Sequence, residues 1–372
     1  MIDDFNLEQL IDPLQEWFLS HARILPWREQ PIPYYVWVSE IMLQQTRVEA
    51  VKPYFERFIA KLPDVKALAQ CPEDEYLKLW EGLGYYNRVR NLNAAAKQVM
   101  EKFGGRIPDN YEQLLTLKGI GSYTAGAIAS IAYGKPVPAV DGNVLRVMTR
   151  VTADDSDIMS QGVKTRFEKI LRQLMEEHGA EHEHPINPRN FNQALMELGA
   201  MVCVPNGAPH CEECPWHDVC RARIENKIEE LPVKKKAKER RIEKRTVLVI
   251  RDAEKVAIHK RPKKGLLAGL YELPNYPGEM SQEEVLEFMK NMGYVPLRIQ
   301  KTVNAKHIFS HVEWHMNGYV VSVEENAFAT EEQKKLSKEA KLLFVDTEET
   351  REKYAIPTAF AAYVRLFLDQ LR

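Results

Sequence analysis

Apolar side chains recur three and four positions apart from about residue 6 to residue 225, with glycines and prolines at the breaks. This is the period of amphipathic helices, so it predicts a helical region throughout. One predicted helix begins near Val36 and runs on to Phe58, and another covers residues 191–198. Positions 125–132 are rich in small residues, which favours a helix packed closely against its neighbours.

Beyond residue 245 the pattern changes to a period of two, which is typical of strands. Four runs of β-branched and apolar residues are predicted strands: 246–251, 256–260, 312–316 and 319–323. Helical stretches near 283–292 and 356–371 complete an α+β region.

A chain of 372 residues has room for two or three domains with their own cores. We expect an all-α domain over residues 1–227, a linker over 228–245 and an α+β domain over 246–372. The linker holds eight basic side chains among residues 233–245, which suits either an exposed connection or a segment along a phosphate backbone. Over the whole chain Lys+Arg 51 balances Asp+Glu 53, so net charge alone does not indicate a nucleic-acid partner.

The first residues, Met1–Phe5, lack the charged-then-apolar pattern of a signal peptide. No apolar run approaches the length of a membrane span. We therefore expect an intracellular, cytoplasmic protein without a membrane partner.

A glycine-rich hairpin lies within the helical region at residues 117–125, with the sequence Leu-Lys-Gly-Ile-Gly-Ser-Tyr-Thr-Ala. Gly119 and Gly121 let two backbones approach closely, and the N–H groups of the following helix can bind a phosphate. Taken alone, such a hairpin is more often plain helix–helix packing. Asp141 follows after a turn that contains two prolines. A phosphate site with an acid nearby indicates chemistry on a nucleic-acid backbone or sugar.

A second carboxylate, Glu40, stands on an otherwise apolar helix between Val38 and Ile41. It is either a satisfied buried group or one that its surroundings keep protonated. With Asp141 it would form two carboxylates whose environments separate their pKa values. Such a pair suits cleavage of a glycosidic bond, because one acid protonates the leaving group and one carboxylate faces the sugar cation.

Four cysteines fall within residues 203–220, with the spacing C-x7-C-x2-C-x5-C: Cys203, Cys211, Cys214 and Cys220. Thiolates this close in sequence indicate a metal site, and the spacing fits both a zinc ion and a cubane iron–sulfur cluster. Cys71 stands apart and is predicted to be a buried or neutral thiol.

Two polar segments could reach DNA bases. Gln45 and Thr46 follow the Glu40 helix, and Leu83 and Tyr85 lie on a glycine loop. Amides can bind base edges and an apolar side chain can wedge into a base stack. Solvated glutamines and core aromatic residues would explain these segments equally well.

Together these segments resemble the helix-hairpin-helix DNA glycosylases with an iron–sulfur cluster, and among them the adenine DNA glycosylases of the MutY family. The likeness covers nearly the whole chain. The stretches that carry it are 26–28, 36–48, 80–86, 117–125, 139–144 and the four cysteines. The resemblance implies a helix-hairpin-helix near residues 115–130, a 4Fe-4S cluster on the loop 203–220 and a C-terminal Nudix-like domain.

By this resemblance the protein acts in base excision repair and removes adenine from duplex DNA where it is mispaired with 8-oxoguanine, or with guanine. Glu40 would protonate the adenine and Asp141 would stabilise the oxocarbenium ion, while Asn143 and the Tyr123 hydroxyl orient these carboxylates. The implied adenine pocket consists of Trp27, Arg28, Leu43, Val48 and Gln193. The implied contacts to DNA and lesion are Gln45, Thr46, Leu83, Tyr85, Lys118, Gly119, Gly121, Phe309, Ser310 and His311. We expect a monomer on its DNA.

Two implied residues have a direct chemical meaning. A lysine at the position of Tyr123 forms a Schiff base in relatives such as endonuclease III, and tyrosine cannot, so a monofunctional glycosylase is expected. Ser310 can accept from the N7–H of 8-oxoguanine and donate to its O8, whereas guanine N7 is only an acceptor.

Three alternatives remain: a glycosylase with lyase activity or another target base, a lesion-binding protein without catalysis, and a Nudix hydrolase. The first is disfavoured by Tyr123 and by the loop at residues 309–311, and the second by the presence of both Glu40 and Asp141. The third is disfavoured because residues 269–274 open a Nudix box that lacks its acidic continuation. The first cysteine gap is also one residue longer than the commonest family spacing, which a surface loop absorbs easily.

Overall fold

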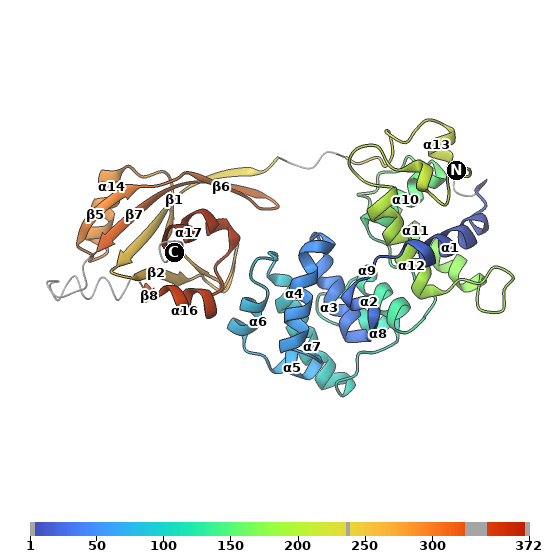
Figure 1. The fold of residues 1–372 in the computed structure, drawn as a ribbon, viewed down its shortest axis with the longest axis horizontal. Coiled ribbons are helices and arrows are strands. Elements are labelled where there is room, and N and C mark those ends of the chain that lie inside the picture. Colours follow the sequence, from blue (N-terminus) through green and yellow to red (C-terminus); the bar gives the residue numbers. More distant parts are fainter. Residues whose placement is uncertain (1–3, 236–238, 324–340, 369–372) are drawn as a thin grey trace. The chain divides into compact units, whose positions relative to one another are not determined.

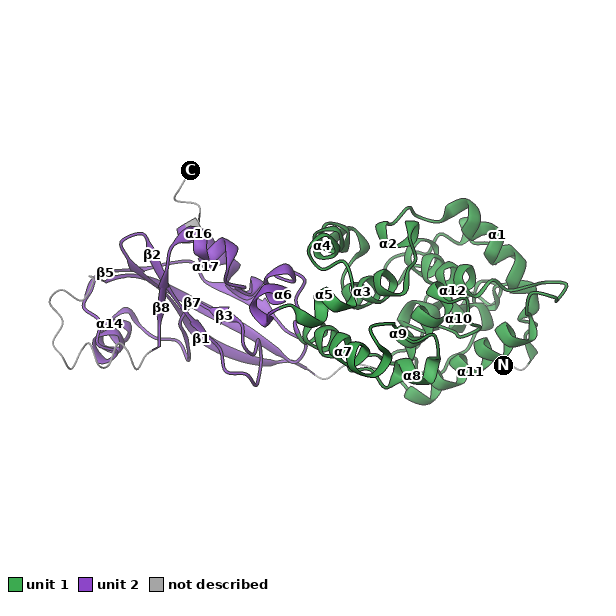
Figure 2. Ribbon diagram, turned by 90° about the horizontal axis from the view of Figure 1, so that it is seen from below, with its two compact units in different colours: residues 1–71, 87–236 green, residues 72–86, 237–372 purple. Residues whose placement is uncertain are grey.

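The computed structural model of the chain describes residues 4–235, 239–323 and 341–368 (Figure 1). The chain forms two compact units (Figure 2). The first unit contains residues 1–71 and 87–236, and the second contains residues 72–86 and 237–372. Within the described ranges, no helix is long and apolar enough to cross a membrane.

The first unit is built from helices in its described part, as the pattern predicts. Its α-helices are α1 (Ile11–His21), α2 (Pro26–Glu29), α3 (Pro33–Leu43), α4 (Val48–Lys61), α5 (Val65–Gln70), α7 (Asn87–Phe103), α8 (Tyr111–Leu115), α9 (Ser122–Ala127), α10 (Gly142–Thr152), α11 (Gln161–Glu177), α12 (Pro188–Glu197) and α13 (Arg221–Ile224). Short 3-10 helices cover Glu8–Leu10 and Cys211–Glu213.

The predicted single helix from Val36 to Phe58 is wrong, because the structure divides it into α3 and α4. The chain leaves α3 at Gln44, and Gln45 adopts the left-handed conformation with φ 59°. A non-glycine residue in this region is uncommon and often marks a functional turn. The apolar period continues through the break, so the pattern alone does not reveal it.

Two helices of the first unit continue into single turns of π-helix. Residues Ile128–Ala132 follow α9, and residues Leu198–Val202 follow α12. Such turns occur frequently at functional sites. The first turn belongs to the helix that follows the glycine hairpin, and the second ends directly before Cys203.

One glycine sets how closely α9 packs. A Cβ added to Gly126 would lie 2.1 Å from the carbonyl oxygen of Pro138, in the turn that precedes α10. No side chain fits at that distance, so the close packing of α9 against this turn requires glycine at position 126.

We expect Gly126→Ala to lower the free energy of unfolding of the helical unit by about 1–3 kcal/mol, because the added methyl group must displace the Pro138 backbone. Urea unfolding followed by circular dichroism measures the change. Gly121→Ala is the matched control, since a Cβ on Gly121 meets nothing within 4 Å. Equal midpoints for the two variants would contradict the packing argument.

The second unit contains one mixed sheet with helices. Its strands are β1 (Arg241–Asp252), β2 (Lys255–Lys260), β3 (Tyr271–Glu272), β4 (Asn275–Pro277), β5 (Pro296–Lys301), β6 (Ala305–Ile308), β7 (Val312–Val323) and β8 (Leu343–Val345). Its helices are α6 (Glu73–Leu79), α14 (Gln282–Asn291), α16 (Thr347–Glu352) and α17 (Ala361–Leu368). The central strand order is β3-β2-β1-β7-β5, and β1 and β7 are parallel.

Successive apolar side chains of β1 belong to the cores on opposite faces of this sheet. Val247 and Val249 belong to a core with Phe360 and Tyr363 beside α17, whereas Leu248 and Ile250 belong to a core with residues of α14. Successive side chains of a strand point to opposite faces. The sheet therefore lies between two hydrophobic layers, one covered by α14 and the other by the C-terminal helix.

Three sequence expectations differ in detail. The structure starts β1 at Arg241, inside the segment assigned to the linker, because residues 241–251 pair with β7. The strands predicted at 312–316 and 319–323 form the single strand β7, through Asn317 and Gly318. The helix predicted over 356–371 begins as α17 at Ala361, and residues 369–371 lie outside the described chain.

Residues 72–86 are fixed to the second unit by polar contacts at several points. Lys78 Nζ donates to the carbonyl oxygens of Thr350 and Tyr354, at 3.3 and 3.0 Å. The Ile356 N–H donates to Glu81 at 2.7 Å, and Lys260 pairs with Asp74 at 2.7 Å. This segment therefore packs with residues far from it in sequence.

Candidate active site

Glu40 lies near the C-terminal end of α3 with only 5% of its surface exposed. Its neighbours Trp37, Val38 and Met42 are completely buried. A carboxylate in such surroundings loses the water that would stabilise its charge. The sequence expectation of a buried carboxylate on an apolar helix is confirmed.

The Tyr123 hydroxyl, at the start of α9, donates a hydrogen bond to Glu40 Oε2 at 2.5 Å. Burial raises the pKa of Glu40 to about 7; the Tyr123 hydrogen bond and the Arg28 charge oppose the rise, and the Asp141 charge adds to it. Burial also raises the pKa of Tyr123 well above its usual value, so the hydroxyl stays a donor. Glu40 can therefore hold a transferable proton near neutral pH.

Asp141 is the N-cap of α10 and is half-buried. Its Oδ1 accepts from the N–H groups of Asn143 and Val144 at 2.9 and 2.8 Å, and its Oδ2 accepts from Asn143 Nδ2 at 2.8 Å. Burial raises the pKa of Asp141, while these hydrogen bonds oppose the rise. Three donors and the helix N-terminus all stabilise the ionised form of this carboxylate.

The two carboxylates differ in their hydrogen bonds, although burial raises the pKa of both. Glu40 is deeply buried with one hydroxyl donor, and Asp141 caps a helix with three donors. The Asp141 charge raises the pKa of Glu40, so the two groups lie within electrostatic reach of each other. One proton donor and one anion in a sheltered site can cleave a glycosidic bond.

Sequence reasoning missed a buried ion-pair group beside this site. Glu197, at the end of α12, is 1% exposed and accepts from Arg23 through both oxygens, at 2.7 and 2.9 Å. It also binds Arg28 at 2.7 Å. Arg28 is thereby held in place, and its charge lowers the pKa of Glu40. Arg23 and Glu197 are 174 positions apart, so no local pattern reveals them.

Arg146 was also missed, and it joins Asp141 to the cysteine segment. It donates to Asn143 Oδ1 at 3.0 Å and to the carbonyl oxygens of Gly199 and Cys203 at 2.6 and 2.8 Å. Asn143 in turn donates to Asp141. The spacing of Asn143 and Arg146 along α10 is that of neighbours on a helix, a signal that could have found this contact.

The four cysteines line one cavity, together with Arg150, Trp216 and Arg223. Arg150 lies 3.3 Å from the Cys203 sulfur, and burial raises the pKa of the Cys214 thiol to about 12. Among the residues described, no three of these sulfurs lie within 4.8 Å of one another. Four thiols around one cavity suit a metal centre.

The hairpin has the geometry that its glycines predict. Gly119 has φ 78°, and a Cβ there would lie 2.6 Å from Asn91 Cβ, so only glycine fits. Gly121 is the N-cap of α9 and supplies no side-chain cap. Lys118, Gly119 and Gly121 are exposed. The first N–H groups of α9 thus remain open to an outside acceptor.

The residues expected to form an adenine pocket all lie in the first unit. Trp27 is buried and packs edge-on against Phe55 at 5.4 Å, while Leu43 and Val48 end α3 and begin α4 with partly exposed side chains. Gln193 is buried on α12.

The residues expected to contact DNA are divided between the units. Gln45 and Thr46 lie in the first, in the left-handed turn between α3 and α4. Leu83 and Tyr85 lie in the second; Leu83 is 7% exposed and Tyr85 is 52% exposed with φ 49°. Gln45 and Tyr85 are therefore both presented to solvent on left-handed backbone.

The loop expected to sense the lesion is the turn between β6 and β7. Phe309 donates its N–H to the Val312 carbonyl at 2.8 Å and packs edge-on against Trp314 at 4.9 Å. Ser310 and His311 are exposed at the tip. The aromatic anchor fixes the loop while it leaves the Ser310 hydroxyl accessible.

The glutamate within residues 269–274, Glu272, is already bound to other side chains of the chain. Glu272 is 2% exposed and pairs with Arg261 at 2.7 Å and with His259 at 3.0 Å. Its pKa is lowered by these partners, which outweigh the effect of burial. A carboxylate already paired with Arg261 and hydrogen-bonded to His259 has little capacity left for Mg²⁺.

Comparisons with known proteins agree with this architecture. Residues 38–173 match the protein-family model described as HhH-GPD superfamily base excision DNA repair protein, and residues 246–366 match the NUDIX domain model. The adenine DNA glycosylase of Mus musculus is 35% identical over 85% of this chain and 71% of its own length. That of Buchnera aphidicola subsp. Schizaphis graminum is 33% identical over 86% of this chain and 88% of its own.

Among solved structures, that of a thermostable thymine-DNA glycosylase is 26% identical, with a TM-score of 0.52. It covers 59% of this chain and 97% of that protein. The predicted fold class, an all-α glycosylase domain followed by a Nudix-like domain, is confirmed by these matches.

Proposed function

The chain belongs to the adenine DNA glycosylase family, and we propose that it hydrolyses the N-glycosidic bond of adenine mispaired with 8-oxoguanine, or with guanine, in duplex DNA. It is a DNA glycosylase of base excision repair. The observation that carries the finer proposal is the buried Glu40 carboxyl, whose pKa is raised to about 7 beside Asp141. A group that is protonated near neutral pH can protonate a purine as it leaves.

Adenine must leave the helical stack before its glycosidic bond can be reached. Glu40, oriented by the Tyr123 hydroxyl, then donates its proton to adenine N7. The bond between C1′ and N9 breaks, its electron pair goes to the base, and adenine departs neutral. Leaving-group protonation of this kind contributes about 10²–10⁴-fold to a rate.

Asp141 serves the sugar side of the same bond. Its carboxylate, held by Asn143 and the N-terminus of α10, stabilises the positive charge that develops at C1′. A water molecule then adds to C1′ and gives a proton to the Glu40 carboxylate, which completes the hydrolysis and restores the proton donor. Arg146 acts as a positioning residue, because it holds the Asn143 amide that orients Asp141.

On the opposite strand, the exposed Ser310 hydroxyl supports recognition of the lesion. It accepts from N7–H and donates to O8 of 8-oxoguanine, and the packing of Phe309 on Trp314 keeps the loop in place. Gln45 and Tyr85, exposed on left-handed backbone, suit insertion beside the displaced base.

The four cysteines would hold a 4Fe-4S cluster with a structural role. The cavity that they line together supports this assignment. The bound cluster would supply a fixed centre around which residues 203–220 fold. The Arg146 guanidinium donates to both the Cys203 carbonyl and Asn143. It therefore positions the cysteine loop and the Asp141 cap together.

A strand-break assay tests the proposed activity. The protein is incubated with a duplex that carries adenine opposite 8-oxoguanine, and products are compared with and without hot alkali. We expect breaks only after alkali, because Tyr123 has no amine to form a Schiff base and the reaction leaves an abasic site.

Two further duplexes serve as controls. One carries thymine opposite guanine, the other cytosine opposite 8-oxoguanine, and neither should lose a base. Breaks without alkali would contradict the monofunctional assignment. Base release from the thymine duplex alone would show that thymine, and not adenine, is the target base. If no duplex released a base, the protein would be a lesion-binding protein without catalysis.

A further inference from the structure

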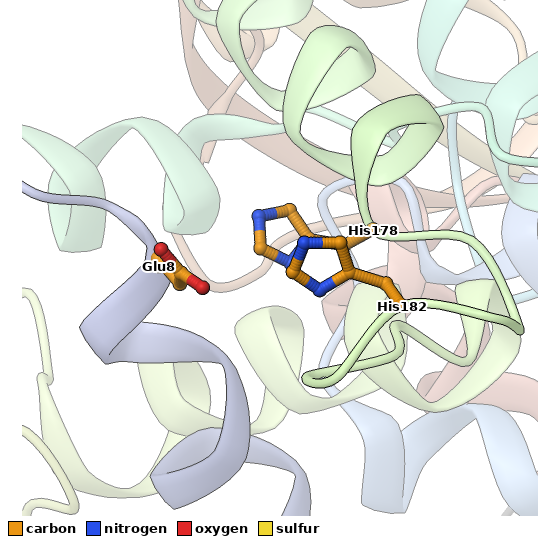
Figure 3. A group of neighbouring side chains, drawn as sticks. All are labelled: Glu8, His178 and His182. Carbon is orange, nitrogen blue, oxygen red and sulfur yellow. The ribbon is translucent and has the colours of Figure 1, made fainter.

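Three metal-ligating side chains that do not belong to the cysteine set lie together in the first unit. Glu8, on the 3-10 helix before α1, faces His178 and His182, which follow the C-terminal end of α11 (Figure 3). One ligand atom of each lies within 4.8 Å of the other two. His178 is buried, whereas Glu8 and His182 are exposed, so a cation could enter from solvent.

The hydrogen bonding of His178 suits a metal ligand. Its Nδ1 lies 3.1 Å from the carbonyl oxygen of His184, which can only accept a hydrogen bond. Nδ1 therefore donates this bond, and Nε2 is the nitrogen left to bind a metal ion. A ring nitrogen held by a carbonyl, with the other nitrogen available, is the usual arrangement of histidine ligands in proteins.

The loop with both histidines is braced against α1 by contacts outside the triad. His184 Nδ1 pairs with Asp12 at 2.5 Å. Gln15 donates to the Pro185 carbonyl at 3.0 Å and accepts from the Asn187 N–H at 2.8 Å. These contacts hold the loop beside the start of α1. A cation that binds Glu8 and the histidines therefore does not have to order a free loop.

We infer that Glu8, His178 and His182 form a binding site for a divalent transition-metal ion, with Zn²⁺ as the matching ion. Two imidazoles and one carboxylate suit zinc, and hard cations such as Mg²⁺ and Ca²⁺ prefer oxygen ligands. Three protein ligands leave a fourth position for water. The ion would connect the N-terminal segment to the loop between α11 and α12.

Binding requires a small rearrangement. A tetrahedral zinc with bonds of about 2.0 Å places its ligand atoms roughly 3.3 Å apart, so the groups must move closer together. The His184 N–H also donates to His182 Nδ1 at 3.1 Å. His182 loses this hydrogen bond whichever nitrogen binds the ion, because Nδ1 either ligates or carries the proton. Zinc binding and the turn at residues 182–184 are therefore coupled.

The test uses the full-length protein with its cysteine site loaded and adventitious metal removed by mild chelation. Calorimetric titration with Zn²⁺ alone should show one bound ion per chain and raise the melting temperature. Glu8→Gln and His182→Ala should each weaken binding by about tenfold or more and remove the thermal shift. Glu183→Gln is the matched control: it makes the same charge change beside His182 but removes no ligand.

Iron content and visible absorbance are followed during the titration, and Co²⁺ in place of Zn²⁺ gives a spectrum that reports its geometry. Tetrahedral Co²⁺ bands in the wild type that are absent from Glu8→Gln would support the site. Equal zinc affinity in all four proteins, zinc uptake that displaces iron from the cysteines, or no uptake at all would each overturn the inference.

Discussion

Replacement of Glu40 by glutamine should lower the single-turnover rate constant of adenine release by about 10²–10⁴-fold, because glutamine has no proton to give to the departing base. In the wild type the rate should fall as pH rises through about 7, where Glu40 loses its proton. In Glu40→Gln this fall should disappear. Rapid-quench measurements from pH 5 to 9 report both effects.

The stability of the same variant relative to the wild type should increase as the pH rises. Folding raises the pKa of Glu40 from 4.5 to about 7, so the wild type has its full stability below pH 4.5 and loses part of it as the pH rises through 7. This loss amounts to about 3 kcal/mol. Glutamine has no charge to bury. The free energy of unfolding of the variant minus that of the wild type should therefore be larger at pH 8 than at pH 5.

Glu56→Gln, on the exposed face of α4, makes the same chemical change at a solvated position. It should alter neither the rate of adenine release nor the difference in stability between pH 5 and pH 8. A Glu40→Gln enzyme that kept a pH-dependent rate within tenfold of the wild type would show that another group donates the proton.

Asp141→Asn should lower the rate constant of adenine release by at least about 10²–10³-fold, since the neutral amide no longer stabilises the charge at C1′. Asparagine caps helices as well as aspartate does, so α10 should remain folded. Its amide would, however, meet the donating Nδ2 of Asn143. Removal of the Asp141 charge also lowers the pKa of Glu40, so residual activity should fall off at lower pH than in the wild type.

The matched control is Asp64→Asn. Asp64 is the N-cap of α5 and accepts from the Ala67 N–H at 2.7 Å, so the substitution is the same in a capping role away from Glu40. Its adenine release should equal that of the wild type. If Asp64→Asn and Asp141→Asn were equally active, the Asp141 carboxylate would have no part beyond capping.

The sequence indicates both carboxylates because each carries a local signal. Glu40 interrupts an apolar helix, and Asp141 precedes a helical run after two prolines. Tyr123 could be placed only through the hairpin and the family resemblance, and its hydrogen bond to Glu40 spans 83 positions. The sequence supplies residue types and local geometry; the tertiary fold supplies the pairing.

Other features leave no local trace. The break at Gln45 is hidden because the apolar period continues across it, and conformation there is decided by packing of α3 and α4. The pairing of Arg23 and Arg28 with Glu197 depends on long-range folding. The length of β1 follows from its parallel partner β7, which the sequence does not identify. In each case a distant partner overrides the local preference.

The anchoring of residues 72–86 bears on how this chain can be dissected. A fragment that ends at the linker would contain these residues but lack the Thr350, Tyr354 and Ile356 backbone groups that they contact. Deletion of residues 237–372 therefore also removes the support of a segment that carries Leu83 and Tyr85. A defect in such a truncated enzyme would combine two losses, and substitutions at Lys78 and Glu81 in the full-length chain are the means to separate them.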